Sequence, residues 1–149
     1  MKVHINDDIK ELLLLEYSKY LPNETGGILF GHYSKDLEVA IVTNVFLNSD
    51  DSKSYRRNFQ RGIRGFNTFS KRMWAKGEFY LGEWHTHPFS LPEMSAQDRQ
   101  QMIHIKNSIK YNCSEPILII IGEIAKNIKS NIFIFNQEGV LVEQQFWKS

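Results

Sequence analysis

The chain has 149 residues, a length typical of one compact domain, so we expect a single domain over residues 1–149. Hydrophobic residues make up 42% and charged residues 23%, the balance of a globular protein that buries its own core. The formal net charge is only +1, so overall charge favours neither nucleic acid nor a membrane surface as a partner. The one cysteine, Cys113, excludes an internal disulfide, and we interpret it as a small buried apolar residue rather than a reactive thiol.

The first 17 residues contain an apolar run of only four leucines, with charged residues on both sides. Such a run is too short for a signal peptide or a membrane span, so we expect a cytoplasmic protein.

The first half of the chain alternates between strand and helix patterns. Asn6, Asp7 and Asp8 supply helix-capping chemistry, and apolar side chains then recur at helical spacing until Pro22. Runs rich in β-branched residues indicate strands. The elements expected here are a strand at 3–5, a helix that ends before Pro22, strands at 28–33 and 38–47, a polar loop at 48–54, and a helix at 59–76.

The second half is expected to continue with a strand at 79–87, a loop, a helix at 95–112, a buried strand at 116–123 and a closing antiparallel pair at 131–135 and 139–147. The fold class predicted from these patterns is mixed α/β, with a central mixed sheet flanked by helices.

The chemistry-bearing residues gather around the end of the strand at 79–87. His85 and His87 are two apart in a strand, so both imidazoles point to one face. Ser95 and Asp98 are three apart at a helix start, so they also share a face. Two histidines and a carboxylate form a catalytic zinc set, because three protein ligands leave the fourth position for water.

Each of these features also has an ordinary structural interpretation. A His-x-His pair in a strand is more often structural, and the spacing of Ser95 and Asp98 is that of a helix capping box. Glu24 could be an exposed acid after a helix, and Pro88 could end an edge strand. Spacing alone therefore leaves a zinc hydrolase as one interpretation among several.

Four separated sequence elements together resemble the signature of the JAMM/MPN metallopeptidase family. The first two are Glu24-Thr25-Gly26-Gly27 and His85-Thr86-His87-Pro88. The third is Ser95, which follows the seven residues from Pro88 to Met94, and the fourth is Asp98, after two intervening residues. The expected order of elements is similar to that domain over nearly the whole chain. The resemblance implies a Zn²⁺ ion bound by His85, His87 and Asp98, with Glu24 activating the water and Ser95 stabilising the oxyanion.

The same resemblance implies hydrolysis of the bond after the C-terminal tail of a ubiquitin-like or similarly conjugated protein. The string from Leu81 to Pro88 is most similar to bacterial stand-alone members, some of which accompany E1/E2-like conjugation proteins in antiphage defence systems of the CBASS kind. The implied partner is therefore a modifier or conjugated protein, with no membrane and no nucleic acid.

Glu83 and the dipeptide Leu91-Pro92 depart from many relatives. By strand alternation Glu83 shares the face of His85 and His87, which makes it a rival for the role of base. We favour two other interpretations of Glu83, a carboxylate that orients a histidine or a solvated strand residue. The departure at Leu91-Pro92 is expected to affect the shape of the substrate groove more than the binding of zinc.

Residues 53–76 contain eight of the 18 basic residues and no acid. This asymmetry indicates a polarised surface. In the relatives this stretch flanks the groove for the substrate tail, so the resemblance implies that it docks the modifier or its target. The alternatives are the solvated face of an amphipathic helix and a nucleic-acid contact. Two other functions also remain open for the chain, a zinc amidase acting on small peptides or sulfur-carrier tails and a non-catalytic scaffold. Glu24 argues against the scaffold, which has no use for a water-activating acid.

Overall fold

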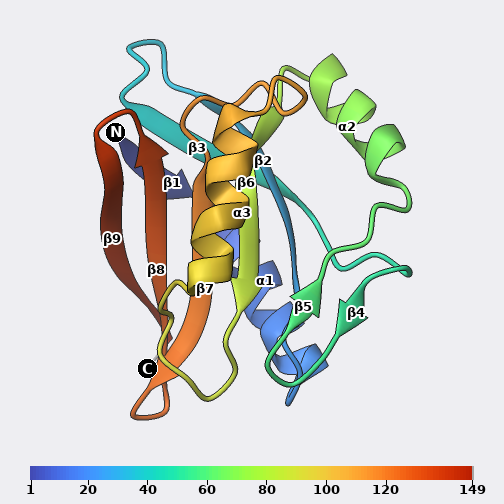
Figure 1. Cartoon of the computed structure of the whole chain (residues 1–149), viewed down its shortest axis with the longest axis vertical. Helices are drawn as coiled ribbons and strands as arrows, with labels where there is room; N and C mark the ends of the chain where they lie inside the picture. Colours follow the sequence, from blue (N-terminus) through green and yellow to red (C-terminus); the bar gives the residue numbers. More distant parts are fainter. Residues whose placement is uncertain (149) are drawn as a thin grey trace.

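The computed structural model describes residues 1–148, with the backbone alone for Phe146 and Lys148. Three helices and a seven-stranded sheet make up most of the chain (Figure 1). The helices are α1 (Asp7–Tyr20), α2 (Phe66–Ala75) and α3 (Ala96–Asn107). The strands are β1 (Lys2–Ile5), β2 (Gly26–Tyr33), β3 (Val39–Phe46), β4 (Lys53–Ser54), β5 (Phe59–Gln60), β6 (Phe79–Thr86), β7 (Ile117–Ile124), β8 (Asn127–Asn136) and β9 (Gly139–Lys148).

The large sheet has the strand order β1-β3-β2-β6-β7-β8-β9. The pairs β1–β3 and β6–β7 are parallel, and all other neighbouring pairs are antiparallel. The mixed α/β class with a central mixed sheet is thus confirmed. None of the helices within residues 1–148 is long and apolar enough to cross a bilayer.

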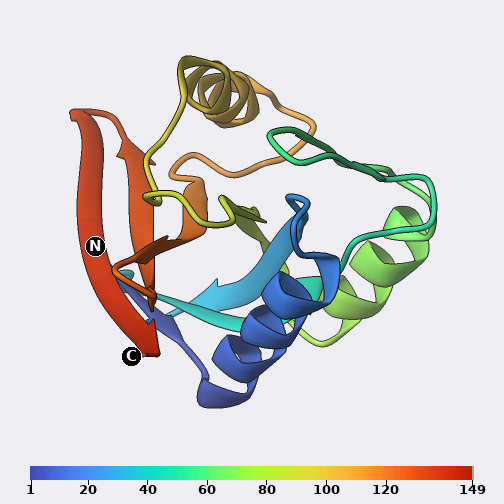
Figure 2. The same cartoon turned by 90° about the horizontal axis from the view of Figure 1, so that it is seen from below.

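Helices cover both faces of the sheet, because alternate strand residues supply an apolar surface on each side. Ile9, Leu13 and Tyr17 of α1 pack on one face, in a cluster that includes Leu29, Leu81 and Trp84 of the central strands. On the other face, α3 packs Met102 and Ile105 against β7 and β8, and α2 packs Met73 beside Phe30 of β2. Figure 2 shows α1 (blue) on the opposite side of the sheet from α3 (olive), with α2 (green) at the right of the view.

The helix expected at 59–76 is wrong over its first seven residues. Phe59 and Gln60 form β5, which pairs with β4 in a short hairpin, and α2 begins only at Phe66. Two features prevent an earlier start. Gly65 adopts the left-handed conformation at φ 81°, and the Asp51 carboxylate accepts the N–H groups of Ile63 and Arg64, both at 3.0 Å.

The other elements differ from expectation mainly at their ends. Helix α3 stops at Asn107, five residues before the expected end, because Ser108 leaves the helical conformation and residues 109–112 form turns. Strand β8 begins at Asn127 instead of 131, since residues 127–130 continue the antiparallel pairing with β7.

Close packing between β6 and β7 requires a glycine at position 82. Gly82 has φ 153°, and a Cβ built there would lie 1.8 Å from the Ile117 carbonyl oxygen of β7. The two strands can therefore approach this closely only without a side chain at that point.

We expect Gly82→Ala to lower the free energy of unfolding by roughly 3 kcal/mol or more, since both the clash and the backbone conformation oppose it. The matched control is Gly65→Ala, which also has a positive φ but open space around the new Cβ, and should cost only about 1–2 kcal/mol. Urea unfolding measures both. Equal costs at the two sites would contradict the proposed clash.

Candidate active site

His85 lies at the carboxyl end of β6, and His87 follows the last residue of that strand. Strand β6 is central in the sheet, between β2 and β7. Their ring centroids are 5.0 Å apart, and the backbone N–H of His87 donates to the Ile121 carbonyl of β7 at 2.8 Å. Strand alternation does place both rings together, as the sequence predicted. Pairing on both sides of β6 holds the backbone of the two histidines in place.

Ser95 and Asp98 form the capping box at the start of α3. The Asp98 N–H donates to Ser95 Oγ at 3.0 Å, and the Ser95 N–H donates to Asp98 Oδ2 at 2.9 Å. This reciprocal pair fixes the Asp98 side chain at the amino end of the helix. The structural interpretation of these two residues therefore holds, and it does not compete with a role in metal binding.

Three potential ligand atoms, one each from His85, His87 and Asp98, lie within 4.8 Å of one another. Asp98 Oδ2 is 3.4 Å from His85 Nε2 and 4.0 Å from His87 Nε2. Ligand atoms about 2.0–2.1 Å from a tetrahedral zinc ion are separated by about 3.3 Å, so this spacing suits such an ion with small adjustments. The residues brought together are those that the sequence motif indicated.

The chemistry of the three donors also fits a metal. His85 Nε2 is buried and makes no hydrogen bond, because its contact with Asp98 lacks the required geometry. A buried nitrogen without a partner is costly, and coordination would satisfy it. No other group of three or more histidine, cysteine or acidic side chains that could hold a metal occurs within the described part of the chain.

The protonation states favour metal binding at neutral pH. Burial raises the pKa of Asp98, but the His85 ring and the hydrogen bonds with Ser95 outweigh burial and lower that pKa to about 2. Burial and the neighbouring His85 both lower the pKa of His87, so its ring is neutral. An ionised carboxylate and a neutral imidazole are the forms that bind a metal ion.

Glu24 lies in the segment between α1 and β2, and it lines the same groove as the two histidines and Asp98. Its backbone N–H donates to the Tyr55 carbonyl of the β4–β5 hairpin at 2.7 Å. Burial, with a smaller contribution from Asp98, raises the pKa of Glu24 from 4.5 to about 7, although His85 acts in the opposite direction. A carboxyl group with this pKa can both accept and return a proton near neutral pH.

Thr25 and Thr86 connect Glu24 to the histidines, and sequence reasoning missed this role for them. The Thr25 N–H donates to Thr86 Oγ1 at 3.0 Å, and the Thr86 N–H donates to the Thr25 carbonyl at 2.9 Å. Both residues are fully buried. Asn48 extends the connection, because its Nδ2 donates to Thr25 Oγ1 at 2.8 Å and to Ser54 Oγ of the hairpin at 3.0 Å. The position of Thr86 between the two histidines was the only signal available.

Glu83 does share the groove with His85, but each of its carboxylate oxygens already has a partner. Arg61 Nε donates to Glu83 Oε1 at 2.8 Å, and the Tyr80 hydroxyl donates to Oε2 at 2.5 Å. Burial, the strongest influence, raises the pKa of Glu83, while Arg61 opposes that rise. Both oxygens are occupied and neither bonds a histidine, so the geometry favours Glu24 over Glu83 as the base. Glu83 instead holds Arg61.

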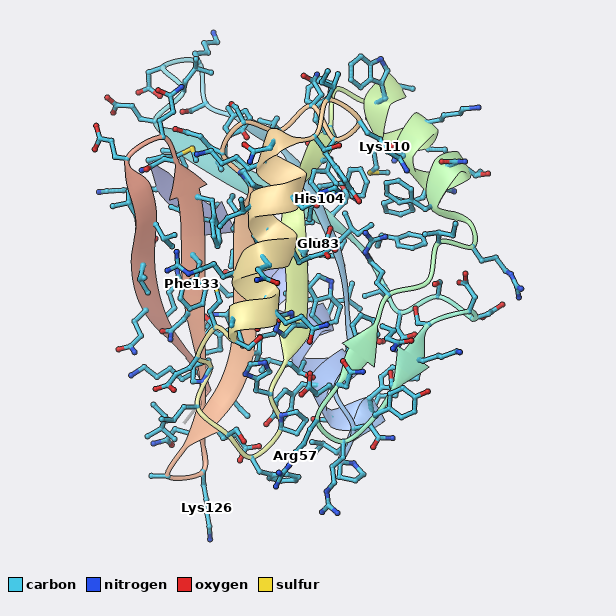
Figure 3. All side chains as sticks on the ribbon, in the orientation of Figure 1. Arg57, Glu83, His104, Lys110, Lys126 and Phe133 are labelled. Atoms are coloured by element: carbon cyan, nitrogen blue, oxygen red, sulfur yellow. The ribbon has the colours of Figure 1, made fainter. Side chains whose placement is uncertain are left out.

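A groove of about 1120 Å³ surrounds this cluster. One wall is the β4–β5 hairpin with its arginines, and the facing wall is the first turns of α3. Figure 3 shows Glu83 in the interior beside β6 and α3, whereas Arg57 lies at the lower edge of the molecule. The charged, histidine and serine residues discussed here that line this groove are Glu24, Arg56, Arg57, Arg61, Glu83, His85, His87, Ser95 and Asp98.

The loop that follows His87 is fixed by a contact on its far side. Tyr17 of α1 donates its hydroxyl proton to Glu123 Oε1 at 2.6 Å and accepts the N–H of Phe89 at 3.3 Å. Phe89 has a positive φ of 59°, and its side chain is 63% exposed at the mouth of the groove. No pattern in the sequence predicted this contact.

In the metal-free protein the raised pKa of Glu24 makes stability fall with rising pH. Between 4.5 and about 7 the folded chain binds more protons at Glu24 than the unfolded chain, so this contribution is complete below 4.5 and lost as pH rises through 7. We expect Glu24→Gln in chelator to lose less stability than wild type between about pH 5 and about pH 8, by urea unfolding. Glu93→Gln, an exposed acid, is the control and should behave as wild type. Parallel curves for wild type and Glu24→Gln would contradict the raised pKa.

Comparison with known proteins agrees with the motif. The family model of prokaryotic homologues of the JAB domain matches residues 9–133. A CD-NTase/cGAS isopeptidase of Enterobacter hormaechei subsp. hoffmannii is 40% identical over 118 residues, which are 79% of this chain and 66% of that protein. A probable metalloprotease, y4qB, of Sinorhizobium fredii is 26% identical over 123 residues, which are 80% of this chain and 74% of that protein.

The fold is shared with a solved structure. The solution structure of a Desulfitobacterium hafniense protein matches with a TM-score of 0.71 at 23% identity, covering 96% of this chain and 90% of that one. The chain spans just under two thirds of the Enterobacter relative's length. The resemblance drawn from the four motif elements is confirmed, and since the family model covers most of the sequence, this chain belongs to the prokaryotic homologues of the JAB domain.

Proposed function

We propose that this protein is a zinc-dependent isopeptidase that hydrolyses the amide bond after the C-terminal tail of a ubiquitin-like or similarly conjugated protein. His85, His87 and Asp98 bind the metal, Glu24 is the general base, and Ser95 stabilises the oxyanion. The observation that carries the proposal is the meeting of three ligand atoms with Glu24 in one groove. A structural metal site has no need of a further, partly buried carboxyl group in the same groove.

Zinc, when bound, supplies Lewis acidity to the water and to the scissile carbonyl. The Glu24 carboxylate takes the proton of the attacking water and returns it to the leaving amine nitrogen. Its place in the groove beside the three ligand residues suits a group that accepts and then returns a proton. Ser95 Oγ already accepts the Asp98 N–H, so its own hydroxyl proton remains available to the developing oxyanion.

The substrate class is inferred from the relative and from the groove. The Enterobacter protein is named a CD-NTase/cGAS isopeptidase, which supports a conjugated protein of that system as the substrate here, with E1/E2-like proteins as functional neighbours and antiphage defence as the setting. A groove of about 1120 Å³ is larger than a small amide needs, which favours a protein tail over the amidase alternative.

The decisive experiment separates metal binding from turnover. We expect purified protein to carry about one zinc per chain and to cleave a fusion whose tail ends in glycine, and His85→Ala and Asp98→Ala to lose both properties. Glu24→Gln should keep zinc but lose about 10²–10⁴-fold in kcat, because it removes only the proton transfer. Metal analysis and single-turnover cleavage measure the two properties.

Glu93→Gln is the matched control, as an exposed acid of the loop before α3 that should keep both zinc and turnover. Zinc content unchanged in His85→Ala and Asp98→Ala would refute the metal site. A Glu24→Gln enzyme as fast as wild type would refute the base.

The hairpin turn offers a second test, on how the protein substrate docks. Arg56 and Arg57 are exposed and line the groove, so they would attract an acidic partner surface and raise the encounter rate. Replacing both by Ser should raise KM for the protein conjugate and flatten its salt dependence, with little effect on a one-residue amide. Lys71 and Lys76, exposed and away from the groove, provide the matched double replacement, which should leave KM unchanged. If the two double variants behave alike, the hairpin has no docking role.

A further inference from the structure

Arg61 and Glu83 form an ion pair on the floor of the groove, outside the metal cluster. Arg61 follows β5 of the hairpin, and Glu83 lies on β6 two residues before His85. The side chains are only 18% and 11% exposed, respectively, and Arg61 Nε donates to Glu83 Oε1 at 2.8 Å. The Tyr80 hydroxyl occupies the second Glu83 oxygen. Each oxygen of the carboxylate thus accepts one hydrogen bond, and Oε1 holds the guanidinium through Nε.

The rest of the guanidinium is free to bind something else. Only Nε of Arg61 makes a hydrogen bond or ion pair with the described residues, although a guanidinium carries five donors. Its terminal nitrogens are not among the buried side-chain atoms that lack a partner, which in this part of the chain belong to Trp84, His85, Ser130 and Asn131. These nitrogens therefore keep some exposed surface, and Arg61 lines the groove.

We propose that Arg61 is a substrate-binding residue that donates to a backbone carbonyl of the tail, and that Glu83 is the residue that positions it. This inference rests on the proposed function, since it assigns a contact to the tail of that substrate. Carbonyl oxygens occur in every tail, so the contact selects an extended main chain rather than a particular side chain. A guanidinium held at Nε presents its remaining fork in one orientation, which lysine cannot reproduce.

The position of the pair sets where along the tail the contact falls. Strand residues rise about 3.3 Å each, so Glu83 stands about 7 Å behind His85 along β6. Because β6 is paired with β2 and β7, the tail would lie in the groove over the face of β6, where an extended chain advances at the same rate. Arg61 therefore meets the tail about two residues before the scissile bond, and an acyl group of a single residue is too short to reach it.

The test varies tail length and Arg61 together. We expect Arg61→Lys to raise KM roughly tenfold or more for acetylated glycine-ended coumarin amides of four residues, with kcat within about twofold, because a charge-assisted hydrogen bond is lost. The one-residue amide should show no change. Arg61→Met combined with Glu83→Gln should give the same pattern, since it removes the contact without leaving a buried carboxylate unpaired. Arg64→Lys, exposed and outside the groove, is the matched control.

A binding measurement keeps the inference independent of turnover. Calorimetry with zinc-loaded Glu24→Gln protein should give a Kd for the four-residue peptide amide that rises roughly tenfold when Arg61→Lys is added. An unchanged Kd, or an equal loss of activity on amides of every length, would overturn the role of Arg61. Normal peptide binding by a wild-type protein that cleaves no amide would instead refute the proposed function and leave the Arg61 contact standing.

Discussion

The geometry of the site depends on one pair of buried residues, Thr25 and Thr86. Their reciprocal hydrogen bonds, at 3.0 and 2.9 Å, join the start of β2 to the end of β6. Glu24 precedes one partner and the two histidines flank the other, so this pair sets the position of Glu24 relative to His85 and His87. Water does not compete for these bonds, because both threonines are fully buried, and the preorganisation that catalysis requires is therefore built into the sheet.

Asp98 shows how one side chain can satisfy a structural and a chemical requirement together. Its Oδ2 accepts the Ser95 N–H of the capping box and also faces both histidines. The capping bond orients the carboxylate, and the His85 ring together with the Ser95 hydrogen bonds lowers its pKa to about 2. The structural and functional interpretations of Ser95-Ala96-Gln97-Asp98 were alternatives in the sequence, but in space the first supports the second.

Local patterns predicted what depends on neighbours in sequence, and failed where contacts are distant. Alternation in β6 placed His85 and His87 on one face, and spacing placed Ser95 beside Asp98. The resemblance to the family motif was needed to link Asp98 with the histidines. The apolar spacing that begins at Phe59 suggested a helix, yet Phe59 packs near Gly26 and the Asp51 carboxylate draws residues 63–64 into a loop. Arg61 could be counted only as one basic residue among eight, since no spacing reveals a partner 22 residues away on another strand.

Sheet topology explains why these distant residues meet at one edge. Strand β7 runs parallel to β6, so both strands end on the same side of the sheet. The chain must therefore cross back between them, and it does so through the loop after His87 and helix α3. Strand β2 is antiparallel to β6, so Glu24 enters β2 where His85 leaves β6. Strand β3 is antiparallel to β2 and ends at the same edge, which is where Asn48 leads into the hairpin. The change from antiparallel pairing with β2 to parallel pairing with β7, at β6, thus places Glu24, the two histidines, Asp98 and the hairpin around a single groove.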